Sequence, residues 1–339
     1  MPAKTPNNHA QDPGLTPMLQ QYREIKQAHA DCILFFRMGD FYEMFFDDAV
    51  RASRILNIAL TSRDKDSDNP TPMCGFPHHA ATTYIARLIG ANLKVAICEQ
   101  VEDPKKARGL VKREVIKIIT PGTVLDQNLL DARANNYLMA IHERRSGFGA
   151  AYIDLSTGDF AVAQFGGERG GEDLGLLLET ITPSELLVPE SISEALLRGL
   201  QPPDRRIMIN RLPDFDFAAD AARDDLQKHL GVHSLHGFGC EDMPLAIGAA
   251  GALLSYLRDT QKHDLDHLKR LRVHRFEGVM VLDQATLRNL ELTRTILHGS
   301  RTGTLLDLLD RAITPMGSRT IRNWLLQPLT GTSRIAARQ

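Results

Sequence analysis

The chain has 339 residues, of which 43% are hydrophobic and 24% are charged. This composition is typical of globular domains and excludes collagen, a coiled coil and a wholly disordered chain. The longest stretch without a charged residue, Met243–Leu257, has 15 residues, whereas a membrane-spanning helix needs about 20. At about 100–200 residues per domain, the length predicts two or three domains.

The N-terminal segment Met1–Gly14 has no apolar core, which predicts a disordered tail rather than a signal peptide. The cysteines lie far apart in the sequence and form no C-x-x-C pair: Cys32, Cys74, Cys98 and Cys240. This spacing is typical of reduced, buried thiols rather than of a disulfide framework. We therefore expect a cytoplasmic protein without a membrane anchor.

The net charge of −2 hides a strong asymmetry along the chain. Residues 1–128 hold 16 Lys and Arg against 15 Asp and Glu, a net charge of +1. Residues 129–266 hold 12 against 22, a net charge of −10, and residues 267–339 hold 12 against 5, a net charge of +7. An acidic middle is a poor surface for phosphate backbones, so the flanking parts are the candidates for nucleic-acid binding.

Helical and extended patterns alternate up to residue 119, which predicts an α/β domain. A hydroxyl cap followed by proline, Thr16-Pro17, predicts the first helix start. Further helices are predicted over Phe45–Leu56 and from Thr82 or Thr83 to Leu88, and strands over Cys32–Phe36, Ala59–Thr61, Lys94–Cys98 and Val115–Ile119. Between them, Ser62–Pro72 is predicted as a surface loop and Met73–Pro77 as a tight connection.

The middle of the chain again mixes strands and helices. A hairpin is predicted from Phe148–Leu155 and Phe160–Phe165, followed by helices over Glu172–Ile181 and Ser191–Leu200 with a strand at Leu186–Val188 between them. This order predicts an α/β layer with a parallel strand. The last part is helical, with a buried helix over Met243–Gln261 and further helices over Gln284–Leu297, Thr304–Ile313 and from Thr314-Pro315 to before Pro328.

Motifs for catalysis are largely missing from the sequence. The dipeptide Gly-Lys does not occur, so there is no P-loop for ATP in these residues. His233, His236 and Cys240 have a spacing that could hold a metal, but a fourth ligand is not evident; Cys74 with His78 and His79 is a weaker candidate. The carboxylates Asp131, Asp154 and Asp159 could bind Mg²⁺ in a nuclease, although aspartate in a hairpin turn commonly serves the turn itself.

The segment from Gly39 to Phe46 is unusual because it holds four aromatic residues in a chain that is only 6% aromatic. If the segment begins a helix, Phe41 and Phe45 share one face and Tyr42 and Phe46 share another. One narrow stripe cannot bury all four rings. We therefore expect at least one of them to point outward, with a well-packed helix start as the alternative interpretation.

Eight sequence blocks, in this order, resemble the MutS family of bacterial DNA mismatch-recognition proteins. They are MGDFYEMF, ALTSR, PMCGFPHHA, VAICEQVEDP, IITPGT, GFGAAYIDLSTGDF, LDQATLRNLEL and TPMGSRTIRNWL. The resemblance runs from about Thr16 to the last residue, and the F-Y-E block is its most specific part.

The resemblance implies a multidomain α/β fold in three parts. Residues 1–128 would be a mixed α/β mismatch-binding domain, residues 129–266 an RNase-H-like α/β connector, and residues 267–339 the beginning of an all-α lever domain. The chain would then be a fragment without the family's ATPase and dimerisation domain. We accordingly expect no catalytic, cofactor or metal site in these residues, and ATP and Mg²⁺ only in the absent C-terminal domain of a homodimeric, DNA-dependent ATPase.

The resemblance also implies which residues contact DNA. In the family, the Phe of the F-x-E motif wedges into the duplex at a mispair or small loop from the minor groove, and the Glu hydrogen-bonds a mispaired base; these positions match Phe41 and Glu43. Further contacts to double-stranded DNA are expected from residues near the wedge: Arg63, Lys65, Met73, Arg108, Lys112 and Arg113. A downstream, MutL-like repair protein is the expected partner of the connector.

Two other functions stay open at this point. A metal-dependent nuclease would use the region of Asp154 and Asp159. A protein-interaction module would use the acidic connector around Glu172, Asp173 and Glu179, and this function is compatible with DNA binding by the first domain.

Overall fold

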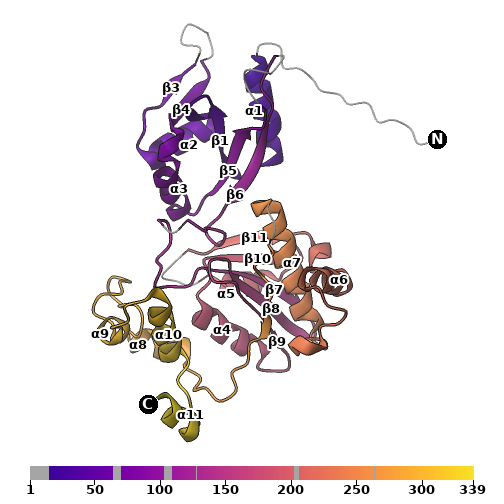
Figure 1. The fold of residues 1–339 in the computed structure, drawn as a ribbon, viewed down its shortest axis with the longest axis vertical. Helices are drawn as coiled ribbons and strands as arrows, with labels where there is room; N and C mark the ends of the chain where they lie inside the picture. The colour runs from indigo at the N-terminus through magenta and orange to yellow at the C-terminus, as the bar shows by residue number, and fades with distance from the viewer. Residues whose placement is uncertain (1–14, 64–69, 103–108, 127, 202–205, 263–264) are drawn as a thin grey trace, which may run out of the picture. The chain divides into compact units, whose positions relative to one another are not determined.

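The computed structural model describes residues 15–63, 70–102, 109–126, 128–201, 206–262 and 265–339. The chain divides into two compact units between Ile119 and Thr120 (Figure 1). Each unit contains a six-stranded mixed sheet, so the predicted α/β class is confirmed. The domain boundaries expected at residues 128 and 266 stay predictions.

Unit 1 has the strand order β3-β4-β2-β1-β5-β6. Its strands are β1 (Cys32–Met38), β2 (Phe41–Phe45), β3 (Thr61–Ser62), β4 (Pro72–Pro77), β5 (Lys94–Gln100) and β6 (Arg113–Ile119). Its helices are α1 (Pro17–Ala28), α2 (Phe46–Leu56) and α3 (Ala81–Gly90), with a short 3-10 turn η1 (His78–Ala80) before α3. Strand β1 is parallel to β5 and antiparallel to β2, which is in turn antiparallel to β4.

Both faces of the unit 1 sheet are covered by helices. On one face, Leu34, Phe36 and Phe45 form a buried cluster with Leu19 and Tyr22 of α1. On the other face, Phe76 packs edge-on against Phe35 and stacks on Tyr84 of α3, whose ring centroid is 4.1 Å away. Strand β2 in the middle of the sheet is therefore held between two apolar layers.

Two segments of unit 1 differ from the prediction. Phe41–Phe45 forms β2 rather than the start of a helix, and Pro72–Pro77, predicted as loop and connection, forms β4. The short strand β3 lies at Thr61–Ser62 and overlaps the predicted strand Ala59–Thr61 only at Thr61. The reason is that β2 finds pairing partners on both sides, and its alternation distributes the rings over two faces. Helix α2 begins only at Phe46, where a positive φ of 54° turns the chain out of the strand.

Unit 2 has the strand order β11-β10-β7-β8-β9-β12. Its strands are β7 (Tyr137–Arg144), β8 (Gly147–Asp154), β9 (Asp159–Phe165), β10 (Glu185–Pro189), β11 (Met208–Leu212) and β12 (Leu271–Val273). The predicted hairpin is β8–β9, and β7 extends it to an antiparallel meander. The predicted parallel strand is β10, which pairs in parallel with β7 and β11. Strands β7, β11 and β12 were not predicted, and neither was helix α6 (Ala219–Leu230).

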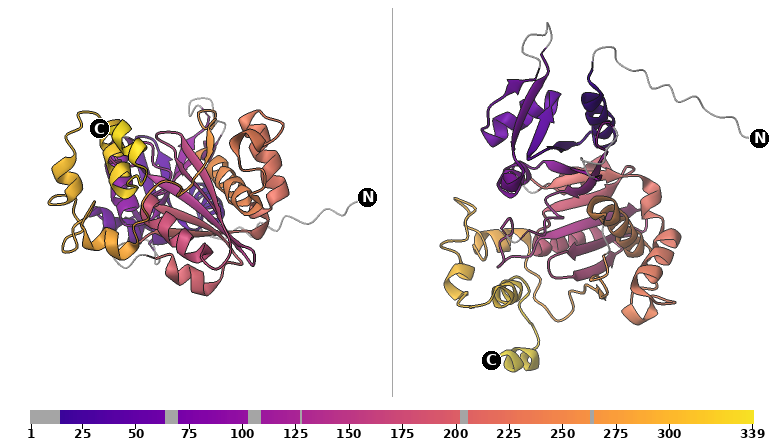
Figure 2. Two further views of the ribbon diagram at one scale, coloured as in Figure 1. Left: turned by 90° about the horizontal axis from the view of Figure 1, so that it is seen from below. Right: turned by 45° about the horizontal axis from the view of Figure 1, so that its top comes forward.

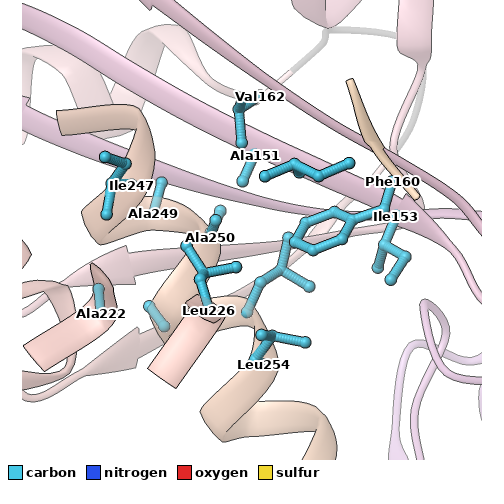
Figure 3. Close-up of a cluster of buried hydrophobic side chains, with 14 of the residues drawn as sticks. Ala151, Ile153, Phe160, Val162, Ala222, Leu226, Ile247, Ala249, Ala250 and Leu254 are labelled. Atoms are coloured by element: carbon cyan, nitrogen blue, oxygen red, sulfur yellow. The ribbon is translucent and has the colours of Figure 1, made fainter. Parts of the chain in front are cut away.

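Helices cover both faces of the second sheet. One face packs on α6 and α7 (Pro244–Gln261), and Figure 3 shows Ile153 and Phe160 of the sheet facing Leu226 of α6 and Leu254 of α7. The other face packs on α4 (Gly170–Ile181), and α5 (Glu194–Gly199) follows strand β10. Two 3-10 turns, η2 (Asp214–Phe217) and η3 (His236–Phe238), flank α6.

The last part of unit 2 consists of small helices, drawn in colours from orange to yellow in Figure 2: α8 (Gln284–Asn289), α9 (Leu305–Leu309), α10 (Pro315–Leu326) and α11 (Thr332–Arg338). The predicted caps at Thr304 and Thr314 are confirmed, since the Thr304 hydroxyl accepts from the Asp307 N–H at 3.1 Å and the Thr314 hydroxyl from the Gly317 N–H at 3.2 Å. In unit 1, Thr16 precedes α1 as predicted but its hydroxyl makes no cap hydrogen bond, and α3 begins at Ala81, before the predicted cap at Thr82 or Thr83. Helix α8 is shorter than predicted because Glu291 adopts a positive φ of 46°. No helix within the described ranges is both long and apolar enough to cross a bilayer.

Candidate nucleic-acid interface

Phe41 lies at the tip of the β1–β2 hairpin. Met38 pairs with Phe41 across a two-residue connection, Gly39-Asp40, in which Gly39 has a positive φ of 56°. Tight hairpins favour glycine at such a position because it has no Cβ to clash. The connection places Phe41 at the first position of β2, where it is 44% exposed.

Two side chains outside the tip fix its backbone. Arg37 Nε donates to the Gly39 carbonyl at 2.6 Å. The His78 backbone N–H donates to the Asp40 carbonyl at 2.8 Å, and the His78 ring Nδ1 lies 3.0 Å from the same oxygen. Sequence reasoning considered His78 only as a weak metal ligand. The signal it missed is positional, because Phe41 of β2 pairs with Pro77 just before this histidine.

The other aromatic residues of the segment are withdrawn from solvent. Tyr42 and Phe45 are buried and Phe46 is half-buried. The Tyr42 ring packs against Phe35 at 5.7 Å between centroids, and its hydroxyl donates to Glu99. The expectation of at least one outward ring is confirmed. The cause is the position of Phe41 at the hairpin tip and not helix geometry, since Phe45 lies on the same face of β2 and is fully buried.

Glu43 lies on the same face of β2 as Phe41, between Phe36 of β1 and Gly75 of β4. Its Oε2 atom is buried and makes no hydrogen bond within the described residues. Among the described residues it pairs with one cation, Arg63, whose Nη1 lies 3.8 Å from Oε2. Burial raises the pKa of Glu43 above its usual 4.5, and the charges of Arg63 and Arg113 only partly oppose this.

The predicted basic contacts fall into different environments. Arg63 lies next to Glu43 and its side chain is 37% exposed, while Lys112 is exposed and pairs with Glu114 at 2.6 Å. Met73 pairs with Phe45 and is half-buried against the α1 side of the sheet. Lys65 and Arg108 lie outside the described residues.

Arg113 has a structural role in unit 1. It is only 7% exposed, and its guanidinium lies over the Phe36 ring at 4.9 Å from the centroid. Its nitrogens donate to the Arg37 carbonyl at 2.8 Å and to Gln21 Oε1 at 3.0 Å. Arg113 is therefore a fixed internal cation that supports β1 and β6, and we leave it out of the proposed phosphate contacts.

The carboxylates of the nuclease interpretation are engaged in structural hydrogen bonds. Asp154 is fully buried and accepts from Asn135 Nδ2 at 2.7 Å and from the Ser156 N–H at 2.9 Å. Asp159 pairs with Arg272 at 2.9 Å and accepts from the Tyr137 hydroxyl at 2.9 Å. These groups serve the β8–β9 turn and its surroundings, so a Mg²⁺ site gains no support from them.

The metal-ligand candidates likewise do not converge. Within the described ranges, no group of three His, Cys, Asp or Glu side chains could hold a metal ion. Cys240 is buried in the α7-side core of unit 2, and Cys74 is buried with its Sγ near the Ala49 carbonyl at 3.4 Å.

The acidic residues of the interaction interpretation line a pocket in unit 2. Glu172, Asp173 and Glu179 on α4 contribute to a cavity of about 500 Å³, together with Arg169, Arg198 and the segment around Val281. Arg169 pairs with Glu172 at 3.3 Å on an exposed surface. The predicted residues are thus brought together on one side of α4.

Comparison with known proteins gives a consistent family. The family model of MutS domain I matches residues 16–128, that of MutS domain II matches residues 136–269, and that of MutS domain III matches residues 285–339. The DNA mismatch repair protein MutS of Symbiobacterium thermophilum is 48% identical over 329 residues, and its counterparts in Desulforapulum autotrophicum and Myxococcus xanthus are 44% identical over 330 residues.

These alignments cover 95–96% of this chain but only 36–37% of each relative, so the chain spans little more than a third of their length. The three domain matches follow one another in family order and leave only short gaps between them. The chain therefore belongs to the MutS family of DNA mismatch repair proteins.

Proposed function

We propose that unit 1 senses mispairs and small loops in double-stranded DNA, with Phe41 inserting into the duplex from the minor groove and Glu43 hydrogen-bonding a mispaired base. The observation that carries this proposal is the 44% exposure of Phe41 at a braced hairpin tip, beside aromatic rings that are buried or half-buried. A large apolar ring in such a position is available to stack on a base.

The physical basis of recognition is deformability. Inserting an apolar wedge costs a few kcal/mol of unstacking, and the cost is smaller at a mispaired step, which is already poorly stacked. Bending the duplex is also easier where it is soft. A wedge therefore needs no base sequence and can accept many mispairs, as a mismatch sensor must.

Glu43 adds selectivity against matched DNA. Its raised pKa makes protonation easier than for an ordinary glutamate. The protonated form can donate to a base nitrogen, while the ionised form can accept from a base N–H. The buried Oε2 has no hydrogen bond within the described residues, so a base could supply one. A matched, well-stacked pair offers no free partner and leaves a carboxylate among phosphates, which disfavours binding.

Phosphate contacts are proposed for the exposed basic residues around the tip. Arg63 and Lys112 have accessible cationic groups in unit 1. Lys65 and Arg108 stay predictions of the same kind. Such contacts position the duplex and carry no sequence information.

The test of the wedge is Phe41→Ala in the complete protein, measured as the ratio of heteroduplex to homoduplex affinity at fixed salt. Stacking of a base on an aromatic ring is worth about 1–3 kcal/mol, so we expect the ratio to fall by a factor of about 5 to 150. Phe215→Ala is the matched control, because Phe215 is 74% exposed on η2 of unit 2. A ratio that Phe41→Ala leaves unchanged would contradict the proposal.

Further properties of the complete protein belong to the same proposal. Homodimerisation and a DNA-dependent ATPase using ATP and Mg²⁺ would reside in sequence beyond these 339 residues, within which no P-loop motif occurs. A second candidate function is compatible with the first. The acidic pocket beside α4 suggests a docking surface for a basic segment of a MutL-like partner.

A further inference from the structure

The neighbours of Glu43 in the sheet determine the direction in which its side chain can extend. Its cross-strand neighbour in β4 is Gly75, and a Cβ at that position would lie 3.3 Å from Glu43 Cγ and 2.9 Å from the Tyr42 carbonyl oxygen. On the other side, the neighbour in β1 is Phe36, which is fully buried. Because Gly75 has no side chain, Glu43 can extend across β4 toward Arg63, which directly follows β3.

Two cations act on this carboxylate, and they differ in freedom. Arg113 is fixed by several hydrogen bonds and by the Phe36 ring. Within the described residues, the Arg63 side chain makes one ion pair, the 3.8 Å approach to Glu43, and no hydrogen bond. It is 37% exposed, against 20% for the Glu43 side chain. No acidic group acts on the Glu43 carboxyl within those residues. Arg113 is thus a fixed counter-ion of Glu43, and Arg63 is a replaceable one.

We propose that Arg63 is a displaceable counter-ion of Glu43: its guanidinium partly neutralises the carboxylate in the free protein and moves to a DNA phosphate when a duplex binds. This inference rests on the proposed function, since it assigns Arg63 a positioning role that acts through Glu43. A charge-assisted pair with phosphate is short and strong, whereas the existing pair is long and half-exposed.

The exchange changes what Glu43 can do. Once Arg63 leaves, the carboxylate keeps only the fixed charge of Arg113 and gains phosphates nearby, so its pKa rises further. The protonated carboxyl then becomes a hydrogen-bond donor to a base. Heteroduplex binding is therefore coupled to proton uptake by Glu43. The protonated carboxyl is offered to a mispaired base only after a DNA phosphate has bound Arg63.

The first test measures the Glu43 carboxyl titration in the free chain by ¹³C NMR of labelled glutamate, assigned with Glu43→Gln. Removing a half-exposed counter-ion in Arg63→Gln should raise the Glu43 pKa by about 0.5 unit. Arg63→Lys keeps the charge and should stay near the wild-type value. If Arg63→Gln leaves the titration unchanged, the counter-ion role is wrong, whatever the variant does to DNA binding.

The second test follows heteroduplex affinity against pH for the complete protein. Wild type should bind more tightly as pH falls toward the Glu43 pKa, Arg63→Gln should show a shallower dependence, and Glu43→Gln should lose this component. If Arg63→Gln lowers the affinity by the same factor at every pH, Arg63 is a phosphate contact only. That result would contradict the proposed move of Arg63 from Glu43 to phosphate. Phe41→Ala measured alongside separates this failure from failure of the proposed function, because only the latter leaves its heteroduplex-to-homoduplex ratio unchanged.

Discussion

Glu43 is held at a cost to the stability of unit 1. Burial raises its pKa above the usual 4.5. When the pKa of a carboxyl is higher in the folded than in the unfolded state, the carboxyl contributes its full stability only at pH values below the unfolded-state pKa. That stability is lost as pH rises from about 4.5 through the folded-state pKa. At neutral pH the ionised group is therefore a net burden, which the approach of Arg63 only partly relieves.

We accordingly expect Glu43→Gln to increase the free energy of unfolding at pH 7. The gain should shrink as pH falls through the raised pKa and vanish below about pH 4, where both side chains are neutral. Urea unfolding of the full chain at a series of pH values measures it. A Glu43→Gln protein that is less stable than wild type at pH 7 would mean that the pair with Arg63 outweighs burial.

Arg113 and Lys112 illustrate what sequence reasoning could not separate. Both stand in one basic run and both were predicted to contact DNA. Strand β6 begins at Arg113 and turns its side chain onto Phe36, whereas Lys112 precedes the strand and stays exposed. The difference depends on the long-range contacts of the Arg113 side chain with Phe36 of β1 and Gln21 of α1, which charge along the chain does not encode. Phe41 and Glu43 were identified by a specific motif, not by charge.

At the scale of elements, local patterns predicted most helices and most of the longer buried strands, but they missed β7, which is eight residues long and largely buried. Most of the other failures were segments whose conformation depends on distant partners. Strand β2 exists because β1 and β4 pair with it on both sides, and its aromatic spacing also suits a helix. Strands β11 and β12 are short and lie at the edges of the sheet, where their partners, β10 and β9, define them.

Close packing of α7 on β8 depends on a strand position without a side chain. A Cβ at Gly149 would lie 2.1 Å from the Leu245 carbonyl carbon and 2.4 Å from the Ala246 nitrogen. These are backbone atoms at the first turn of α7, which Gln164 Oε1 caps by accepting from the Leu245 N–H at 2.9 Å. If α7 moved away from β8 to make room for a Cβ, it would lose this cap hydrogen bond.

We therefore expect Gly149→Ala to lower the free energy of unfolding by about 2 kcal/mol or more, as overpacking does. Gly175→Ala is the matched control, since a Cβ at Gly175 in α4 meets nothing within 4 Å; alanine there should stabilise the helix by up to about 1 kcal/mol. Denaturant unfolding followed by circular dichroism compares the two. Equal stabilities would refute the close approach of α7 to β8.

On the scale of the whole molecule, the proposed DNA contacts and the acid-rich surface belong to different units. Phe41, Glu43 and Arg63 lie in unit 1, while Glu172 and Asp173 lie on α4 of unit 2. Residues 129–266, with a net charge of −10, make an unfavourable surface for phosphate and a favourable one for a basic partner. The two proposed activities should therefore separate by mutation.

The double variant Glu172→Lys and Asp173→Lys should weaken binding of the cognate MutL-like protein, because truncating or reversing charges at an interface commonly costs 2 kcal/mol or more, about 30-fold. The heteroduplex-to-homoduplex ratio should stay at the wild-type value. Asp220→Lys with Asp224→Lys is the control, since it makes the same change in net charge on exposed positions of α6, which covers the opposite face of the sheet. If both double variants lose partner binding equally, the loss depends on net charge alone, and the pocket beside α4 is not the docking site.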